Sequence, residues 1–244
     1  MNMILAGAGA RAVRCDIAPS RFARVNREGY FTIDAAWIVP ALCHAVHVEG
    51  PILEPCAGRG HMVVELRTLG FEVEAADLYE YEDPLVPDIV TGADVFDLDS
   101  LSGYRSVVTN LPYEDQVAIL AHILPIAARD GCSVAALARS EWRSAQDRSE
   151  LVHDNPRFAG EVVLTKRPIW VRPVIKSPRH WFSWYVWSSE PRALDRDPFL
   201  RFAGKGKGPK MADKTDRTDE TGGPRPNAAI TPTRKLSMGC ERSG

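Results

Sequence analysis

The chain has 244 residues, of which 25% are charged and 45% hydrophobic, as in ordinary globular proteins with one sizeable core. The net charge of -2 gives no general attraction to nucleic acid, so any such binding must come from local basic patches. No apolar run approaches the length of a membrane span, and the opening MNMILAGAGA lacks a basic leader. These features predict a cytoplasmic protein.

Residues 1–28 are expected to form a basic, loosely ordered arm. It is a solvated segment or a strip that touches a phosphate backbone, and its arginines are Arg11, Arg14, Arg21, Arg24 and Arg27. A helix is expected next, with Thr32 or Asp34 as its cap and Pro40 as a kink or a first boundary. Its apolar side is Trp37, Ile38, Ala41, Leu42 and Ala45, at helical spacing.

The segment Pro51 to Asp77 predicts half of a nucleotide-binding βαβ unit. A short apolar strand leads into a turn with Gly58 and Gly60, and a helix and a second apolar strand follow. Asp77 lies nineteen positions after Gly58, where an acidic residue can accept from ribose hydroxyls. This arrangement predicts a ligand that contains adenosine.

The turn lacks the two common phosphate motifs. A dinucleotide fingerprint requires a third glycine where Val63 stands, and a P-loop requires Lys after Gly60, where His61 stands. The run Glu54-Pro-Cys-Ala-Gly-Arg-Gly60 instead resembles the first motif of class I S-adenosylmethionine-dependent methyltransferases, in the form found in enzymes that methylate exocyclic amines. That cofactor has no phosphate, which agrees with a turn without lysine.

The resemblance extends to two further segments. Tyr30-Phe31-Thr32 resembles the aromatic-Thr segment that lines the methionine end of the cofactor, although Ile33 replaces the family's proline. Asp94-Val95-Phe96 resembles the segment that holds the adenine ring. The residues that the resemblance implies as cofactor contacts are Phe31, Thr32, Glu54, Pro55, Cys56, Ala57, Gly58, Gly60, Asp77, Leu78, Asp94, Val95, Phe96 and Asn110.

Predicted strands end at Glu54, Asp77, Asp94 and Asn110. Because ligands bind at the carboxyl ends of parallel strands, we expect these four polar side chains to lie at one edge of the sheet.

The last of these strands leads directly into Asn110-Leu111-Pro112-Tyr113. This tetrad resembles the Asn/Asp-Pro-Pro-Tyr signature of methyltransferases that act on adenine N6, cytosine N4 or glutamine amide nitrogen. It implies that the Asn110 side-chain oxygen and the Leu111 carbonyl accept the N–H groups of the target amine, while Tyr113 stacks on a planar target that is unpaired or flipped out of a duplex. An ordinary turn with a packed tyrosine is the alternative.

Leu111 departs from the proline of the DNA enzymes and matches the version in ribosomal RNA adenine dimethyltransferases. The Glu54 to Gly60 motif, in contrast, resembles the DNA enzymes. The two motifs therefore favour different nucleic acids.

The second half of the chain completes the predicted sheet. Expected elements are a helix over residues 114–128, a strand over 132–138, a polar helix after Ser140 and strands over 161–165 and 180–187. Arg143 and Arg148 are expected to be solvated, and Trp181, Trp184 and Trp187 to be buried.

A basic loop joins the last two strands and is predicted to bind nucleic acid. Its basic side chains would contact phosphates, and its tryptophan would stack on a base. Its residues are Arg167, Trp170, Arg172, Lys176 and Arg179.

The five cysteines predict reduced thiols and no metal site, because the number is odd and no C-x-x-C pair occurs. They are Cys15, Cys43, Cys56, Cys132 and Cys240. A nucleophilic role for Cys56 is an alternative, but the turn needs a small side chain there.

The expected fold is α/β, a Rossmann-like class I methyltransferase fold with a mostly parallel seven-stranded sheet, an antiparallel last strand and helices on both faces. A catalytic domain is expected over residues 29–190 and a disordered tail over 191–244, where large apolar residues are few. The motif order resembles gamma-type amino methyltransferases and implies methylation of adenine N6 in DNA. Methylation of RNA or protein glutamine, or a cofactor-binding module without turnover, are the alternatives.

Overall fold

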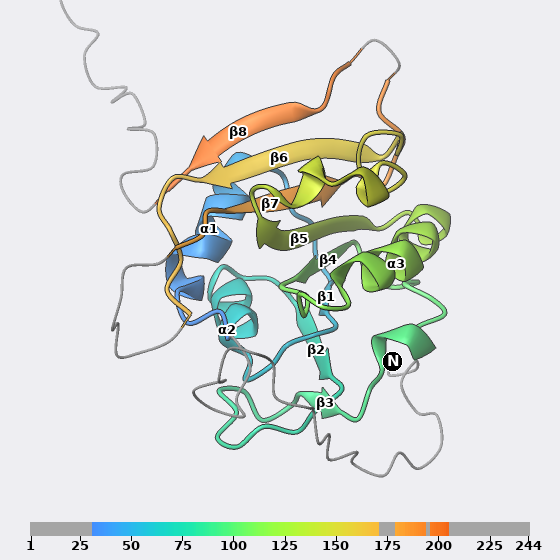
Figure 1. The fold of residues 1–244 in the computed structure, drawn as a ribbon. Coiled ribbons are helices and arrows are strands. Elements are labelled where there is room, and N and C mark those ends of the chain that lie inside the picture. The colour runs from blue at the N-terminus through green and yellow to red at the C-terminus, as the bar shows by residue number, and fades with distance from the viewer. Residues whose placement is uncertain (1–30, 171–178, 194–195, 205–244) are drawn as a thin grey trace, which may run out of the picture. The chain divides into compact units, whose positions relative to one another are not determined.

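The structure is a computed structural model that describes residues 31–170, 179–193 and 196–204. An eight-stranded sheet forms its centre, in the order β3-β2-β1-β4-β5-β7-β6-β8 (Figure 1). Strand β7 is antiparallel to both of its neighbours, and the other neighbouring pairs are parallel. The strands are β1 Ile52–Glu54, β2 Val73–Asp77, β3 Val90–Thr91, β4 Ser106–Thr109, β5 Ser133–Arg139, β6 Phe158–Leu164, β7 Phe182–Trp187 and β8 Phe199–Ala203.

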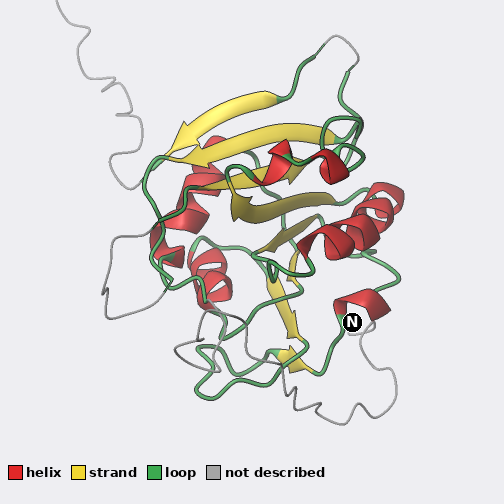
Figure 2. Ribbon diagram, viewed as in Figure 1, coloured by secondary structure: helices red, strands yellow, loops and turns green. Residues whose placement is uncertain are grey.

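Helices cover both faces of the sheet (Figure 2). Helices α1 (Ala35–Ala45) and α2 (His61–Thr68) share one hydrophobic core with one face, and α3 (Gln116–Asp130) shares a second core with the other face. Successive residues of β4, β5 and β7 enter opposite cores, which explains why these strands read as continuous apolar runs. None of the helices among the described residues combines the length and apolar character needed to cross a membrane.

The mostly parallel sheet with helices on both faces confirms the predicted fold class. The predicted number of seven strands is wrong, because β8 extends the sheet beyond β6. The disordered tail was expected to begin at residue 191, and this is wrong for Phe199–Ala203. Phe199 and Ala203 pack against the core that contains α1, so a few apolar side chains suffice where β6 offers a free edge. Residues 205–244 and the N-terminal arm over residues 1–28 lie outside the described residues.

Helix α1 begins after Asp34, which is one of the two expected cap residues. Asp34 is its N-cap residue but makes no capping hydrogen bond with its side chain, which accepts from the Ile169 N–H at 3.0 Å instead. Pro40 lies inside the helix, and the helix is not divided there. The N-terminus of α1 is thereby tied to the chain that follows β6.

The expected helix after Ser140 is replaced by two short 3-10 helices, η2 (Trp142–Ser144) and η3 (Gln146–Arg148). The expectation that Arg143 is merely solvated is wrong. Its Nε lies 2.9 Å from an oxygen of Glu161, which is 3% exposed and needs a counter-charge. Arg148 lies 5.3 Å above the Trp142 ring, so it is also held by packing.

Two of the three tryptophans near the end of the sheet are buried as predicted. Trp184 donates from Nε1 to the Ile38 carbonyl at 3.1 Å, and Trp187 donates to the Leu151 carbonyl at 2.7 Å. Trp181 precedes β7 and is 43% exposed, so the prediction of its burial is wrong.

Candidate functional site

The carboxyl edge of the sheet brings together the polar residues that end the central strands. Glu54 ends β1, Asp77 ends β2, and Asn110 directly follows β4. Strands β2, β1 and β4 are adjacent and parallel, so these side chains lie at the same edge. Asp94 follows β3 by three residues, because β3 is only Val90–Thr91, so the expectation that this strand ends at Asp94 is wrong.

The glycine turn is bound directly to the end of β2. The Gly58 N–H donates to Oδ2 of Asp77 at 2.7 Å, and the Tyr79 N–H donates to Oδ1 at 2.8 Å. Gly58 has φ +55° and Gly60 has φ +88°, which only glycine adopts readily. Burial raises the pKa of Asp77, and the two N–H donors oppose this shift. The glycine turn and the acidic end of β2 are therefore in direct contact.

The aromatic-Thr segment bridges the glycine turn and the tetrad. A Cβ atom added to Gly58 would lie 2.9 Å from the Phe31 ring, so the ring lies against the turn. The neighbouring Thr32 accepts at Oγ1 from Nδ2 of Asn110 at 3.1 Å. Residues far apart in sequence thus form one continuous group at the carboxyl edge.

The protein's own side chains cover part of the turn. The ring centroids of Phe31 and Tyr81 lie 5.1 Å apart, and a Cβ atom on Gly60 would lie 2.7 Å from Val86. The Phe31 and Tyr81 rings therefore lie together beside the turn. Two cavities, of about 380 and 340 Å³, lie elsewhere, beside α3 and at the amino ends of the strands.

Glu54 is 1% exposed, and burial raises its pKa to about 8, although the Thr109 side chain and the Cys56 N–H lower it in part. Burial also raises the pKa of the Cys56 thiol well above its ordinary range, and the charges of Glu54 and Asp77 add to this effect. A thiol in this state is a poor nucleophile, which favours the packing role of Cys56.

The raised pKa of Glu54 predicts a pH-dependent stability. Between its ordinary pKa of 4.5 and about 8, the folded chain holds a proton that the unfolded chain releases, so the stability contributed by Glu54 falls as pH rises through this window. Glutamine at position 54 stays neutral at every pH. From pH 4 to pH 9, the free energy of unfolding of Glu54→Gln is therefore expected to rise relative to that of wild type by on the order of 2–4 kcal/mol. Urea unfolding at both pH values measures the gain. The exposed Glu72→Gln serves as control, and an equal gain there contradicts the assignment.

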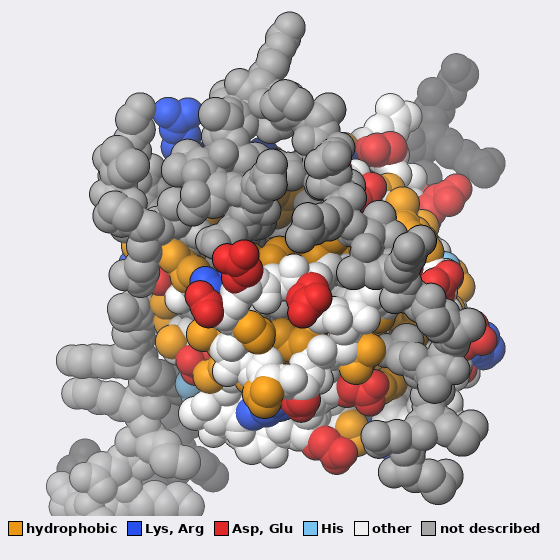
Figure 3. Space-filling model, turned by 90° about the horizontal axis from the view of Figure 1, so that it is seen from below, with side chains coloured by type: hydrophobic (Ala, Val, Ile, Leu, Met, Phe, Trp, Pro, Cys, Tyr) orange, Lys and Arg blue, Asp and Glu red, His pale blue; other side chains and the backbone are white. Residues whose placement is uncertain are grey.

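The segment expected to hold adenine is ordered by its own hydrogen bonds. Oδ1 of Asp94 accepts from the Phe96 N–H at 3.0 Å and caps the 3-10 helix η1 (Val95–Asp97). Phe96 is 46% exposed, and Leu78 at the end of β2 is 37% exposed. Figure 3 views the protein from the β3 side, where acidic side chains lie among hydrophobic ones. The described part of this side offers apolar surface for a ring and carries acidic charge.

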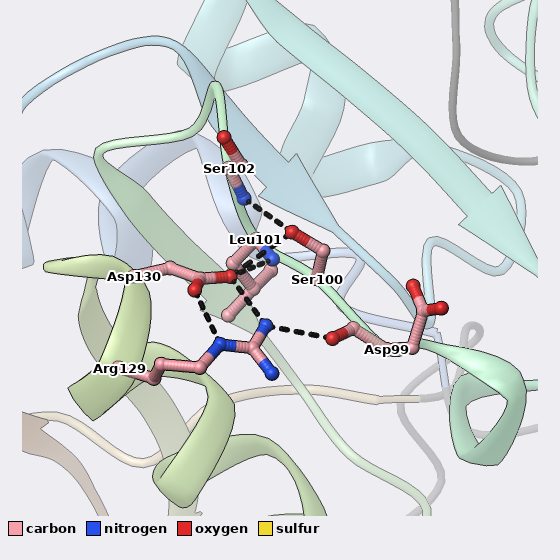
Figure 4. Close-up of polar contacts among 6 residues, drawn as sticks. All are labelled: Asp99, Ser100, Leu101, Ser102, Arg129 and Asp130. Atoms are coloured by element: carbon pink, nitrogen blue, oxygen red, sulfur yellow. Dashed lines mark hydrogen bonds and ion pairs between the residues drawn. The ribbon is translucent and has the colours of Figure 1, made fainter.

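A polar network fixes the chain that leaves η1 (Figure 4). Oδ2 of Asp130, at the end of α3, accepts from the Leu101 N–H at 2.6 Å and from the Ser100 hydroxyl at 3.1 Å. Arg129 pairs with Asp130 at 2.7 Å and donates to the Asp99 carbonyl at 2.7 Å. The Arg129 guanidinium holds the pKa of Asp130 well below its usual range. The network anchors the η1 segment to α3.

The tetrad places an unpaired acceptor beside the turn. Oδ1 of Asn110 is buried and has no hydrogen-bond partner within the described part of the chain, while its Nδ2 is held by Thr32. Leu111 is 1% exposed and its side chain belongs to the core that contains α3. Burial of Leu111 anchors this loop by packing, where a proline would restrict φ. This anchoring is not visible in the sequence.

Tyr113 is 37% exposed and lies between two residues of neighbouring strands. Its ring centroid is 6.2 Å from that of Phe182, and the Arg139 guanidinium lies 5.6 Å from it. Pro112 completes the turn by accepting the Asp115 N–H at 3.2 Å. The tyrosine is therefore supported from the sheet and keeps part of its surface open.

The predicted nucleic-acid loop is only partly described. Arg172 and Lys176 lie outside the described residues. Trp170 is half-buried against Phe182, with ring centroids 4.8 Å apart, so it packs in the core more than the sequence predicts. Arg179 is exposed, and Arg167 lies 4.7 Å from the ring of Trp181. Trp181 and Arg139 are also exposed in this region, and neither was predicted from the sequence to be part of a binding surface.

The chain matches no protein-family model and no curated protein sequence. Among solved structures it is similar to a proposed class I S-adenosylmethionine-dependent methyltransferase from Listeria monocytogenes, at 14% identity and a TM-score of 0.49, over 74% of this chain and 67% of that one. It is also similar to the tRNA (uracil-54, C5)-methyltransferase of Pyrococcus abyssi in complex with S-adenosyl-L-homocysteine, at 18% identity and a TM-score of 0.44, over 62% of this chain and 38% of that one.

A third similar structure is the 1,6-didemethyltoxoflavin-N1-methyltransferase of Burkholderia thailandensis, at 17% identity and a TM-score of 0.44, over 65% of this chain and 80% of that one. The chain thus spans well under two thirds of the tRNA methyltransferase that it matches. At these identities the similarities concern the fold of the backbone alone. Any conclusion about reaction and substrate depends on the site residues.

Proposed function

We propose that the protein is an S-adenosylmethionine-dependent methyltransferase that transfers a methyl group to an exocyclic amino group, adenine N6 in DNA. The observation that carries this proposal is the hydrogen bond from Asn110 to Thr32, next to Phe31, which joins the tetrad to the glycine turn at one edge. The two motifs that resemble amino methyltransferases therefore face a shared region, as the chemistry requires.

The residues at this edge fit the proposed cofactor. Asp77 uses two N–H donors, and an ionised carboxylate has about four acceptor positions, so ribose hydroxyls can still donate to it. The side chain of Arg59 in the turn donates from Nε and Nη2 to the Asp83 carbonyl at 3.0 and 2.7 Å, which fixes the orientation of its guanidinium. The exposed Phe96 and Leu78 offer surface to an adenine ring. When bound, the cofactor supplies an electrophilic methyl group on a sulfonium.

The tetrad supplies the groups that prepare the amine. Oδ1 of Asn110 and the Leu111 carbonyl accept the two N–H hydrogens, which favours a nitrogen whose lone pair is available for the methyl group. Because Nδ2 of Asn110 is held by Thr32, its oxygen is oriented before the substrate binds. Tyr113 offers a ring face on which a flipped or unpaired base stacks.

We further propose that the catalytic domain spans residues 29–190 and is extended by β8. Two alternative functions retain the cofactor but differ in the substrate or in whether methyl transfer occurs. The same chemistry on RNA adenine or protein glutamine is favoured by the Asn-Leu-Pro-Tyr form of the tetrad. A cofactor-binding module without turnover is favoured by Leu111, which departs from the proline of the DNA enzymes.

Methyl transfer from radiolabelled S-adenosylmethionine to separate DNA, RNA and protein pools tests the proposal. We expect label in DNA, recovered as N6-methyladenine after hydrolysis. Label in RNA or protein alone supports the first alternative. Binding of the cofactor without label in any pool supports the second, and absence of cofactor binding refutes the proposal.

A further inference from the structure

Two exposed aromatic side chains lie at the carboxyl edge of the sheet, one on the chain that follows β4 and one directly before β7. Tyr113 is 37% exposed and Trp181 is 43% exposed. An arginine lies over each ring, with the Arg139 guanidinium 5.6 Å from Tyr113 and that of Arg167 4.7 Å from Trp181. The same arrangement, a partly exposed aromatic ring with an arginine guanidinium beside it, therefore occurs at two positions of this edge.

The sheet fixes both units in place. The Trp181 carbonyl accepts from the Ser140 N–H at 3.0 Å, directly after β5, and the next residue, Phe182, is paired with Arg139 in the ladder between β5 and β7. The ring of Phe182 also contacts Tyr113, with centroids 6.2 Å apart. Trp181 is thus attached to the same strand start that supports Tyr113.

The charges around Trp181 are mixed. Arg167 lies over the ring, while Glu141 lies 3.9 Å from the side chain of His180. The affinity of this surface for a strand would therefore include stacking on the rings as well as attraction between its arginines and phosphate. Arg–aromatic pairs are effective here because the guanidinium is itself a planar stacking partner.

We propose that Trp181 and Arg167 form a second stacking site, which holds a base next to the target base in an unpaired DNA strand. This inference rests on the proposed function, in which Tyr113 holds the target. A base stacked on an aromatic ring gains about 1–3 kcal/mol without sequence preference. The second site therefore fixes the strand without selecting its sequence.

The test compares Trp181→Ala with wild type in binding a fluorescein-labelled single-stranded DNA oligonucleotide, followed by anisotropy. We expect affinity to fall about 5- to 100-fold, which corresponds to the loss of one stacked base. Trp181→Phe keeps a ring and is expected to retain most of the affinity. Phe202→Ala is the matched control, since Phe202 is 68% exposed and lies on β8, which β6 separates from β7.

Binding of S-adenosyl-L-homocysteine, measured by calorimetry, is expected to be unchanged in all three variants. Unchanged DNA affinity in Trp181→Ala, an equal loss in Phe202→Ala, or a loss confined to an RNA oligonucleotide of the same sequence overturns the second stacking site. These outcomes differ from failure of the proposed function, which appears in wild type as absence of cofactor binding.

Discussion

Replacing Asn110 with alanine is expected to lower methyl transfer by at least about a hundredfold, the usual loss when one oriented polar group is removed from an active site. Oδ1 of Asn110 is a buried acceptor held in position through Thr32. Alanine removes this acceptor, so one N–H of the target amine loses its partner. Initial rates with the radiolabelled cofactor measure the effect.

Asn110→Asp is the informative control because aspartate keeps an acceptor oxygen at the same position. We expect it to retain a substantial part of the rate, with Thr32 donating in place of accepting. Both variants should keep their thermal stability, since the side chain is only partly buried. A rate in Asn110→Ala equal to that of wild type contradicts the catalytic assignment.

Replacing Gly160 with alanine is expected to destabilise the fold by about 2–4 kcal/mol. Gly160 has φ +152° and lies at an irregularity in the pairing of β6 with β7. A Cβ atom there would overlap the Phe199 carbonyl oxygen and lie 2.5 Å from Cγ of the Phe199 ring. Since the obstacle includes the backbone of β8, relief requires β8 to move away from β6. The midpoint of thermal unfolding measures the loss.

Gly131→Ala separates the effect of the contact from that of the backbone angle. Gly131 has φ +69° and ends α3, but a Cβ atom there would have no neighbour within 4 Å. We expect a loss of about 1 kcal/mol for the left-handed conformation alone. Equal losses in the two variants contradict the close approach of β8 to Gly160.

The central part of the fold was predictable because its signals are local. The turn at Gly58 and Gly60, and the polar residues that end successive strands, depend on nearby sequence and on the rule that ligands bind at the carboxyl ends of parallel strands. The structure joins them through contacts such as the one from Gly58 to Asp77. Predicting that these residues lie together required only that the strands be parallel.

The remaining features depend on neighbours that are distant in sequence. Strand β8 forms because β6 has an open edge and Gly160 has no side chain, neither of which shows in residues 199–203 themselves. Arg143 looks like a surface charge until Glu161 is placed beside it. Trp181 belongs to the apolar run that contains β7, but it lies one residue before the strand begins and is exposed there.

The first helix and the last strand of the described chain pack together, and Arg201 donates to the Ala45 carbonyl 156 residues earlier. At a translation rate of roughly 5–20 residues per second, α1 leaves the ribosome about 8 to 30 s before its partner. Throughout that interval the nascent chain exposes the surface that β8 will cover. Messages that end before codon 199 should therefore yield polypeptides that proteases remove quickly.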